Sequence, residues 1–181
     1  MAGYYPSTCN EIIPPHNCDP CDTREYGRIR SFGFIKSSYN FSNPSSAAEW
    51  RTAMNAENII VVPFSNGELQ AASEVLGQGY GSATETLIGF DFVAVVNDPN
   101  YSENCDFYNA IATSRNYKFF YVTSSHVHIT DVACTFIPKA PIANDLNSEV
   151  VWNVTVKWRD QNHACPYDLP ATIFDDCFIN N

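Results

Sequence analysis

The chain has 181 residues, a length that suits one domain with a single hydrophobic core. Its 20 acidic and 10 basic residues give a formal net charge of −10, which argues against the basic surface that proteins use to grip phosphate backbones. The aromatic content of 14% is high and the charged content of 17% is low. This profile favours a β-rich protein whose faces are partly buried by neighbouring subunits.

Residues 1–27 are predicted to form an extended, Pro- and Cys-rich N-terminal arm. The prolines of this segment disfavour both helix and central strand. The first residues lack the basic and apolar regions of a signal peptide, and no apolar run in the chain approaches the length of a membrane helix. We therefore expect synthesis in a cytoplasm, where thiols stay reduced, and no membrane partner.

Residues 28–158 carry the patterns of a β-rich core. In its first half, Ser46 and Glu49 form a capping-box pair that predicts the start of a short helix, and Asn66-Gly67 is a strong turn signal. The elements expected here are a strand over 28–41, a helix from residue 46 to about 58, a strand over 59–64 and a glycine-rich loop over 70–86.

The second half of the core holds the clearest strand patterns. Apolar side chains, among them Trp152 and Trp158, occupy alternate positions over residues 149–158, so both rings are expected on one wall of a core or interface. Asp91 lies on the face opposite the apolar positions of its strand. The expected elements are a strand over 87–96, a helix over about 103–114, a strand over 117–124, a stretch over 126–137 with a bulge or turn near residues 130–131, and a strand over 149–158.

Residues 159–181 are again Pro- and Cys-bearing and are predicted to form an irregular C-terminal arm. The fold class expected from these patterns is mainly β. It is a β-sandwich or barrel-like core of about six to eight strands with two short α-helices and irregular N- and C-terminal arms.

Cys18 and Cys21 have the Cys-x2-Cys spacing of a zinc knuckle. A tetrahedral site needs two more ligands, and the candidates are Cys9, His16, His163 and Cys165. The preferred pair is His163 and Cys165 in the C-terminal arm, with which zinc would join the two arms. Two other interpretations remain open: a redox dithiol, or structural thiols that bind nothing. No other cofactor is expected.

Other candidate motifs have simpler explanations. His126 and His128 share one strand face, as metal ligands can, but no third ligand is evident nearby, so solvent-facing histidines are the favoured explanation. The glycines at 77, 79 and 81 only loosely resemble a phosphate-binding loop, and an ordinary flexible loop explains them. The sequence has no nucleophile elbow, Walker A loop or HExxH motif, so no enzymatic activity is predicted.

Several segments follow one another between about residues 27 and 160: GRIRSFGFIKSSYNF, IIVVPFSNGEL, ETLIGFDF, NYSENCDFYNAI, YKFFYVTSSHVHI and IPKAPIANDLNSEVVWNVTVKW. In style and order they resemble structural virion proteins of tailed bacteriophages of Bacteroidetes-type hosts, tail-tube-like or capsid-decoration-like. The resemblance implies β-sandwich modules and no catalytic residues.

The function predicted from the sequence is therefore a non-enzymatic phage virion protein that self-assembles, made in the host cytoplasm and located in the virion. A tail-tube or tail-associated ring subunit is expected, with itself and other virion proteins as partners. DNA would only pass by an acidic lumen, to which Asp91 would contribute. The alternatives are a capsid decoration or head-fibre protein, and a zinc-stapled or carbohydrate-binding β-sandwich module.

Overall fold

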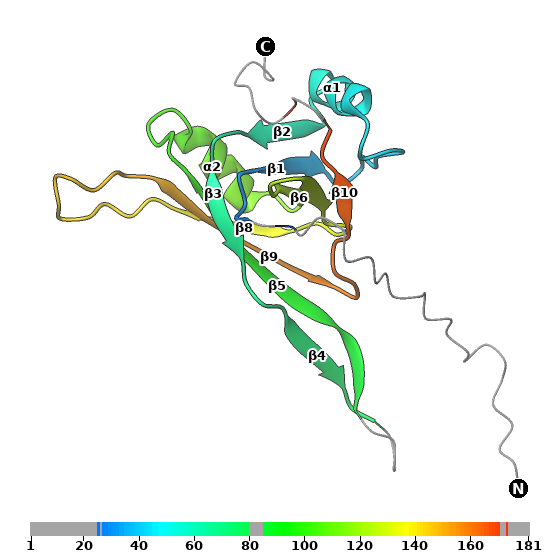
Figure 1. The fold of residues 1–181 in the computed structure, drawn as a ribbon. Helices are drawn as coiled ribbons and strands as arrows, with labels where there is room; N and C mark the ends of the chain where they lie inside the picture. The colour runs from blue at the N-terminus through cyan, green and yellow to red at the C-terminus, as the bar shows by residue number, and fades with distance from the viewer. Residues whose placement is uncertain (1–24, 26, 80–84, 171–172, 174–181) are drawn as a thin grey trace, which may run out of the picture.

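The computed structural model describes residues 25, 27–79, 85–170 and 173, and they form two antiparallel sheets that pack face to face (Figure 1). The expected fold class, a mainly β protein with a β-sandwich-like core and two short helices, is confirmed. Ten strands are present in the described residues, more than the six to eight expected. Neither of the helices there has the length and apolar character to cross a membrane.

The first sheet has the strand order β10-β7-β6-β1-β2. Its strands are β1 (Ser31–Lys36), β2 (Ile59–Val62), β6 (Tyr117–Val122), β7 (His126–Ile129) and β10 (Pro166–Asp168). The second sheet has the order β3-β5-β9-β8, and β4 pairs with β5 beside β3. Its strands are β3 (Asn66–Leu69), β4 (Ser73–Gly77), β5 (Thr86–Asp98), β8 (Thr135–Lys139) and β9 (Trp152–Asp160). The helices are α1 (Ala47–Asn55) and α2 (Cys105–Thr113).

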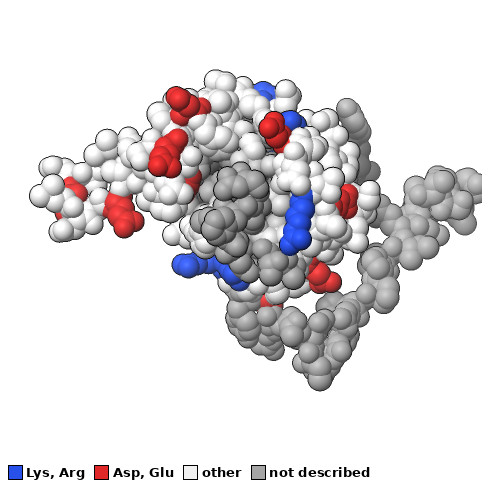
Figure 2. All heavy atoms as spheres, turned by 90° about the horizontal axis from the view of Figure 1, so that it is seen from above, with Lys and Arg blue, Asp and Glu red and all other residues white. Residues whose placement is uncertain are grey.

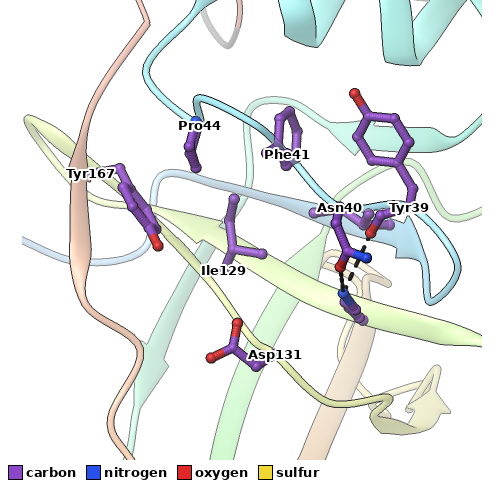
Figure 3. A pocket seen from close by; sticks show the side chains of 9 residues that line it. Tyr39, Asn40, Phe41, Pro44, Ile129, Asp131 and Tyr167 are labelled. Atoms are coloured by element: carbon purple, nitrogen blue, oxygen red, sulfur yellow. Dashed lines mark hydrogen bonds between the residues drawn. The ribbon is translucent and has the colours of Figure 1, made fainter.

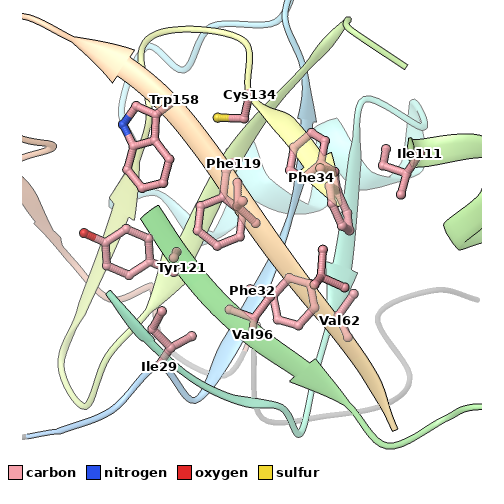
Figure 4. Close-up of a cluster of buried hydrophobic side chains, with 14 of the residues drawn as sticks. Ile29, Phe32, Phe34, Val62, Val96, Ile111, Phe119, Tyr121, Cys134 and Trp158 are labelled. Atoms are coloured by element: carbon pink, nitrogen blue, oxygen red, sulfur yellow. The ribbon is translucent and has the colours of Figure 1, made fainter. Parts of the chain in front are cut away.

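The main core lies between the two sheets and is rich in aromatic rings (Figure 4). Alternate residues of β9 point into it, so Trp152 and Trp158 are each only 7% exposed. Phe92 of β5 stacks on Trp158 with ring centroids 5.2 Å apart. The predicted two-tryptophan wall is therefore part of the core, where burial of each ring contributes several kcal/mol, at about 25 cal/mol per Å².

A second core covers the outer face of the first sheet, where α1 packs. Trp50 and Ala53 of this helix are buried, and the Trp50 indole donates a hydrogen bond to the Pro44 carbonyl at 2.7 Å. The capping box forms in part. The Ser46 hydroxyl accepts from the Glu49 amide, but the Glu49 carboxylate accepts from the amides that precede the helix, at Ser42 and Asn43. The first sheet is thus buried on both faces.

The expected turn at Asn66-Gly67 is instead part of strand β3. The chain reverses just before it, and Phe64 there has a φ of 54°. Gly67 is needed because the backbone of Ile29 bridges to it, and a Cβ at Gly67 would lie 2.6 Å from the Val95 carbonyl oxygen. The glycine-rich segment 70–86, expected to be a loop, likewise contains strand β4.

The stretch 126–137, expected to change direction at a bulge or turn near residues 130–131, leaves β7 at that point and enters β8 of the other sheet. Strand β7 pairs with β6 in the first sheet, and β8 pairs with β9 in the second. Between them the Thr130 hydroxyl accepts from the Phe119 amide at 3.0 Å and donates to the Val132 carbonyl at 3.1 Å. This buried hydroxyl provides hydrogen-bond partners for backbone groups where the chain crosses between the sheets.

Residues 159–170 and 173, the described part of the expected C-terminal arm, are more ordered than an irregular arm. The other residues of that arm, and nearly all of the expected N-terminal arm 1–27, lie outside the described residues. Strand β9 continues to Asp160, and β10 adds an edge strand against β7. Beyond it, Leu169 and Ile173 pack in the second core. The sequence analysis missed this short edge strand, which begins at Pro166, because proline is tolerated at an edge or at the first residue of a strand but otherwise disfavours one.

Candidate functional site

The β4–β5 hairpin extends past the body of the protein (Figure 1). Strand β9 pairs with β5 only from Phe90 onward, so residues 86–89 have β4 as their one strand neighbour among the described residues. Leu76, Leu87 and Ile88 are 46%, 48% and 55% exposed there. A two-stranded ribbon is marginally stable by itself in water, and exposed apolar side chains on it indicate a surface that a partner covers.

The connection between β8 and β9, residues 140–151, projects from the other side of the molecule as a long loop (Figure 1). Asp145 shapes its turn, since its carboxylate accepts from the Asn147 amide and the Ser148 hydroxyl. These hydrogen bonds hold the pKa of Asp145 below its ordinary value. Ile142 is 74% exposed, and Leu146 is fully exposed. The loop is thus a second apolar projection.

The two projections lie at opposite ends of the β5–β9 pair. The register joins Phe90 to Asp160 at the end near the hairpin, and Asp98 to Trp152 at the end near the loop. Strand β5 has 13 residues and runs on into the hairpin, so its own two ends are about 40 Å apart. Two different exposed apolar surfaces at opposite ends favour head-to-tail contacts, in which unlike surfaces of neighbouring copies meet.

The outer face of the second sheet carries polar pairs that cross its strands. The side-chain amides of Asn66, Asn97 and Asn153 form a ladder, with hydrogen bonds of 2.8 and 3.0 Å. Asp91 faces outward as predicted, and both of its oxygens accept from the Arg159 guanidinium, at 2.7 and 2.9 Å. This pair lowers the pKa of Asp91 and neutralises its charge, so Asp91 does not provide the acidic surface expected of it.

The proposed zinc ligands are only partly within the described residues, because Cys18 and Cys21 lie outside them. The His163 ring packs on Phe90 and Phe92, with centroids 4.8 and 5.0 Å away, and Cys165 is exposed. Across the described part of the chain, no three His, Cys, Asp or Glu side chains gather as a metal site requires. The two ligands in the C-terminal segment therefore gain no third ligand from the described residues.

The two histidines of β7 share one strand face, as predicted, but they have different partners. His126 Nδ1 lies 2.8 Å from the Glu25 carboxylate. The His128 ring stacks on Tyr121 at 4.7 Å, and its Nδ1 lies 3.2 Å from the Ala164 carbonyl oxygen. Burial lowers the pKa of His128, so this side chain is an uncharged packing residue near neutral pH.

Glu25 anchors the start of the described chain to the β6–β7 turn. Its carboxylate accepts from the hydroxyls of Ser124 and Ser125, from the Ser125 amide and from His126. The hydrogen bond from the Ser125 hydroxyl is the largest of several causes that hold the pKa of Glu25 far below its ordinary value. No local sequence pattern predicts this cluster, because Glu25 is about 100 residues from its partners.

A small pocket of about 100 Å³ opens beside Lys118 on the α1 side of the first sheet (Figure 3). The Lys118 ammonium is buried and donates to the Asn40 side chain at 2.6 Å and to the Tyr39 carbonyl at 3.3 Å. Asp131 and Tyr167 form the opposite wall. The volume is below the range of about 300–1,000 Å³ usual for small-molecule sites, so we interpret Lys118 as a clamp on the 39–44 segment.

No family model matches this chain, and no curated protein or solved structure is significantly similar to it. Function is therefore argued from the surfaces described above.

Proposed function

We propose that this chain is a non-enzymatic structural subunit that self-assembles, and that it serves as a ring subunit of a phage tail tube. The observation that carries the proposal is the pair of exposed apolar projections at opposite ends of β5 and β9. Head-to-tail contacts close into rings when the rotation between copies allows it, and otherwise give filaments. A symmetric dimer would not need two different projections.

The edge strands of the two sheets also support assembly through the projections, because most of them are unsuited to pairing with a further strand. Proline occurs in the edge strands β8 and β10 and directly after the edge strand β2, at Pro138, Pro166 and Pro63. Proline at an edge blocks further strand pairing. The β3–β4 edge has no proline, and it leads directly into the projecting hairpin.

The tube proposed here does not use β5 as an acidic wall for passing DNA. Asp91 is neutralised by Arg159, and the asparagine ladder further along the same face is uncharged. The net charge of −10 keeps the subunit soluble. The proposal assigns no catalytic residue and no cofactor.

The test is the oligomeric state of the whole chain, measured by sedimentation velocity over a wide concentration range and by negative-stain microscopy. We expect rings or short tubes for the wild-type chain. Replacing Leu76 and Leu87 together with serine is expected to give monomers with an unchanged far-UV circular dichroism spectrum. Leu69→Ser is the matched control, because Leu69 is 38% exposed but lies in β3, outside the projection.

A wild-type chain that stays monomeric at every concentration would contradict the proposal. Discrete dimers or trimers that do not assemble into larger rings or tubes would favour the capsid-decoration alternative.

A further inference from the structure

Basic side chains gather on the outer face of the second sheet, although the chain as a whole is acidic. Strand alternation directs Lys157 and Arg159 of β9 and Lys139 of β8 away from the core. Arg115 joins them by donating to the Thr135 hydroxyl of β8 at 2.9 Å. Arg28 lines a depression of about 310 Å³ at the β3 and β5 end of the face. All five side chains are exposed.

The charge of this face is opposite in sign to that of the molecule. Its outward acidic side chains in the described residues are Glu68 and Asp91, and Asp91 is bound by Arg159. Five basic and two acidic groups leave a formal charge of +3, against −10 for the whole chain. Lys139 and Lys157 have no ion-pair partner in the described part of the chain.

The space between these cations is apolar. Val93 and Val95 of β5 and Ile137 of β8 point outward between the basic residues, and each is only partly buried. The face is therefore suited to a partner that combines carboxylates with apolar side chains.

The loop 140–151 has that chemistry. It exposes Ile142 and Leu146, it carries Asp145 and Glu149, and it contains no Lys or Arg. The neighbouring segment 99–114 adds acidic residues and also lacks Lys and Arg. It lies at the base of the loop, because the Trp152 indole donates to the Tyr101 carbonyl at 3.0 Å. Figure 2 shows acidic side chains, and no basic ones, on the projecting loop.

We propose that the outer face of the second sheet docks the loop 140–151 of a second copy of this chain. The inference rests on the self-assembly proposed above and adds a contact to the one made by the hairpin: acidic and apolar loop against basic and apolar sheet. The loop projects away from its own body (Figure 1), so the contact is intermolecular and heterologous. A nucleic acid is the less suitable partner, since Glu68, Asp91 and the asparagine ladder interrupt the cations.

The test is a charge-swap series measured by sedimentation equilibrium at low ionic strength. Lys157→Glu and Glu149→Lys are each expected to raise the dissociation constant about tenfold or more, because each places like charges across the contact. The double variant is expected to recover most of that loss, since the pair is restored with reversed signs. Arg51→Glu is the control, because it makes the same charge change on the exposed side of α1.

Three results would separate the possibilities. If the wild-type chain associates and neither single variant weakens it, this interface is wrong while self-assembly stands. If the wild-type chain never associates, the proposed function fails and this interface with it. If the wild-type chain retards duplex DNA and Lys157→Glu does not, the face is a polyanion site and the inference is overturned.

Discussion

Leu76 and Leu87 are register partners across the projecting hairpin, and about half of each side chain is exposed to solvent. The ribbon there has no third strand among the described residues, and a bulge between Val75 and Leu76 interrupts its pairing. Nothing in the described structure buries this leucine pair, so the ribbon gains little from burial in the free subunit.

We therefore predict that the amides of residues 74–77 and 86–89 exchange hydrogen quickly in the free subunit and slowly in the assembled state. Residues 94–97 of β5 are the internal control, because they lie between β3 and β9 and should be protected in both states. Hydrogen exchange read by mass spectrometry makes the comparison. Equal exchange of the hairpin in both states would exclude it from the assembly contact.

Gly33 sits where β1 passes closest to its neighbours. A Cβ at this position would lie 2.1 Å from the Ile60 carbonyl oxygen and 2.5 Å from the Phe120 ring. Gly33→Ala must push β1 away from β2, so we expect it to lower the free energy of unfolding by more than about 3 kcal/mol.

The matched control is Gly77→Ala, whose Cβ would lie 3.0 Å from the exposed Ile88 side chain and 3.6 Å from the Thr86 carbonyl oxygen, and should cost little. Urea unfolding of both variants gives the difference. A Gly33→Ala protein as stable as Gly77→Ala would show that the β1–β2 contact is looser than described.

Asp98 is a buried carboxylate that closes the end of β5. It accepts from the Tyr108 hydroxyl at 2.7 Å, from the Asn104 side chain at 3.0 Å and from the Asn100 amide at 2.9 Å. Burial, and secondly the hydrogen bond to Asp98, raises the pKa of Tyr108 far above its ordinary value. The tyrosine hydroxyl therefore remains a donor at every accessible pH.

Tyr108→Phe removes one donor from this carboxylate and should cost about 1.5–3 kcal/mol, as for other hydrogen bonds to charged groups. Tyr101→Phe deletes a hydroxyl from a partly exposed ring and should have almost no effect. Chemical denaturation of the two variants makes the comparison, and equal stabilities would show that water replaces the Tyr108 hydroxyl.

The sequence could predict the parts of the fold that have a local cause. The alternation of Trp152 to Trp158 and the Ser46 cap each depend on residues close in the chain, and both patterns appear in the structure. The turn expected at Asn66-Gly67 is wrong because a long-range contact places these two residues in strand β3. The backbone of Ile29 pairs with Gly67, and no local sequence pattern predicts that bridge.

The candidate surfaces were harder to predict for the same reason. The net charge of −10 does not predict that Arg28, Arg115 and Lys157 lie on the outer face of the second sheet. That grouping depends on the order of strands in the sheet. The alternation over residues 87–96 places Ile88 on the same face as Phe92 and Ala94, but Ile88 is 55% exposed. The pattern was correct, and the difference arises because β5 extends beyond the partner strand that would have covered that residue.

Acid should release the start of the described chain from the β6–β7 turn. Hydrogen bonds, chiefly from the Ser125 hydroxyl, hold the pKa of Glu25 below its ordinary value of 4.5. The folded state therefore binds a proton at Glu25 less readily than the unfolded state does. The stabilisation from Glu25 is complete above pH 4.5 and is lost as the pH falls below that value.

Glu25→Gln tests this dependence, because glutamine keeps the shape of the side chain and removes the charge. Thermal unfolding should show the variant less stable than the wild-type chain at neutral pH, and the difference should shrink as the pH falls below 4.5. Glu74→Gln is the control, since the Glu74 carboxylate accepts no hydrogen bond within the described residues and lies on exposed β4. A difference between wild type and Glu25→Gln that stays constant with pH would show that the carboxylate charge does not hold this anchor.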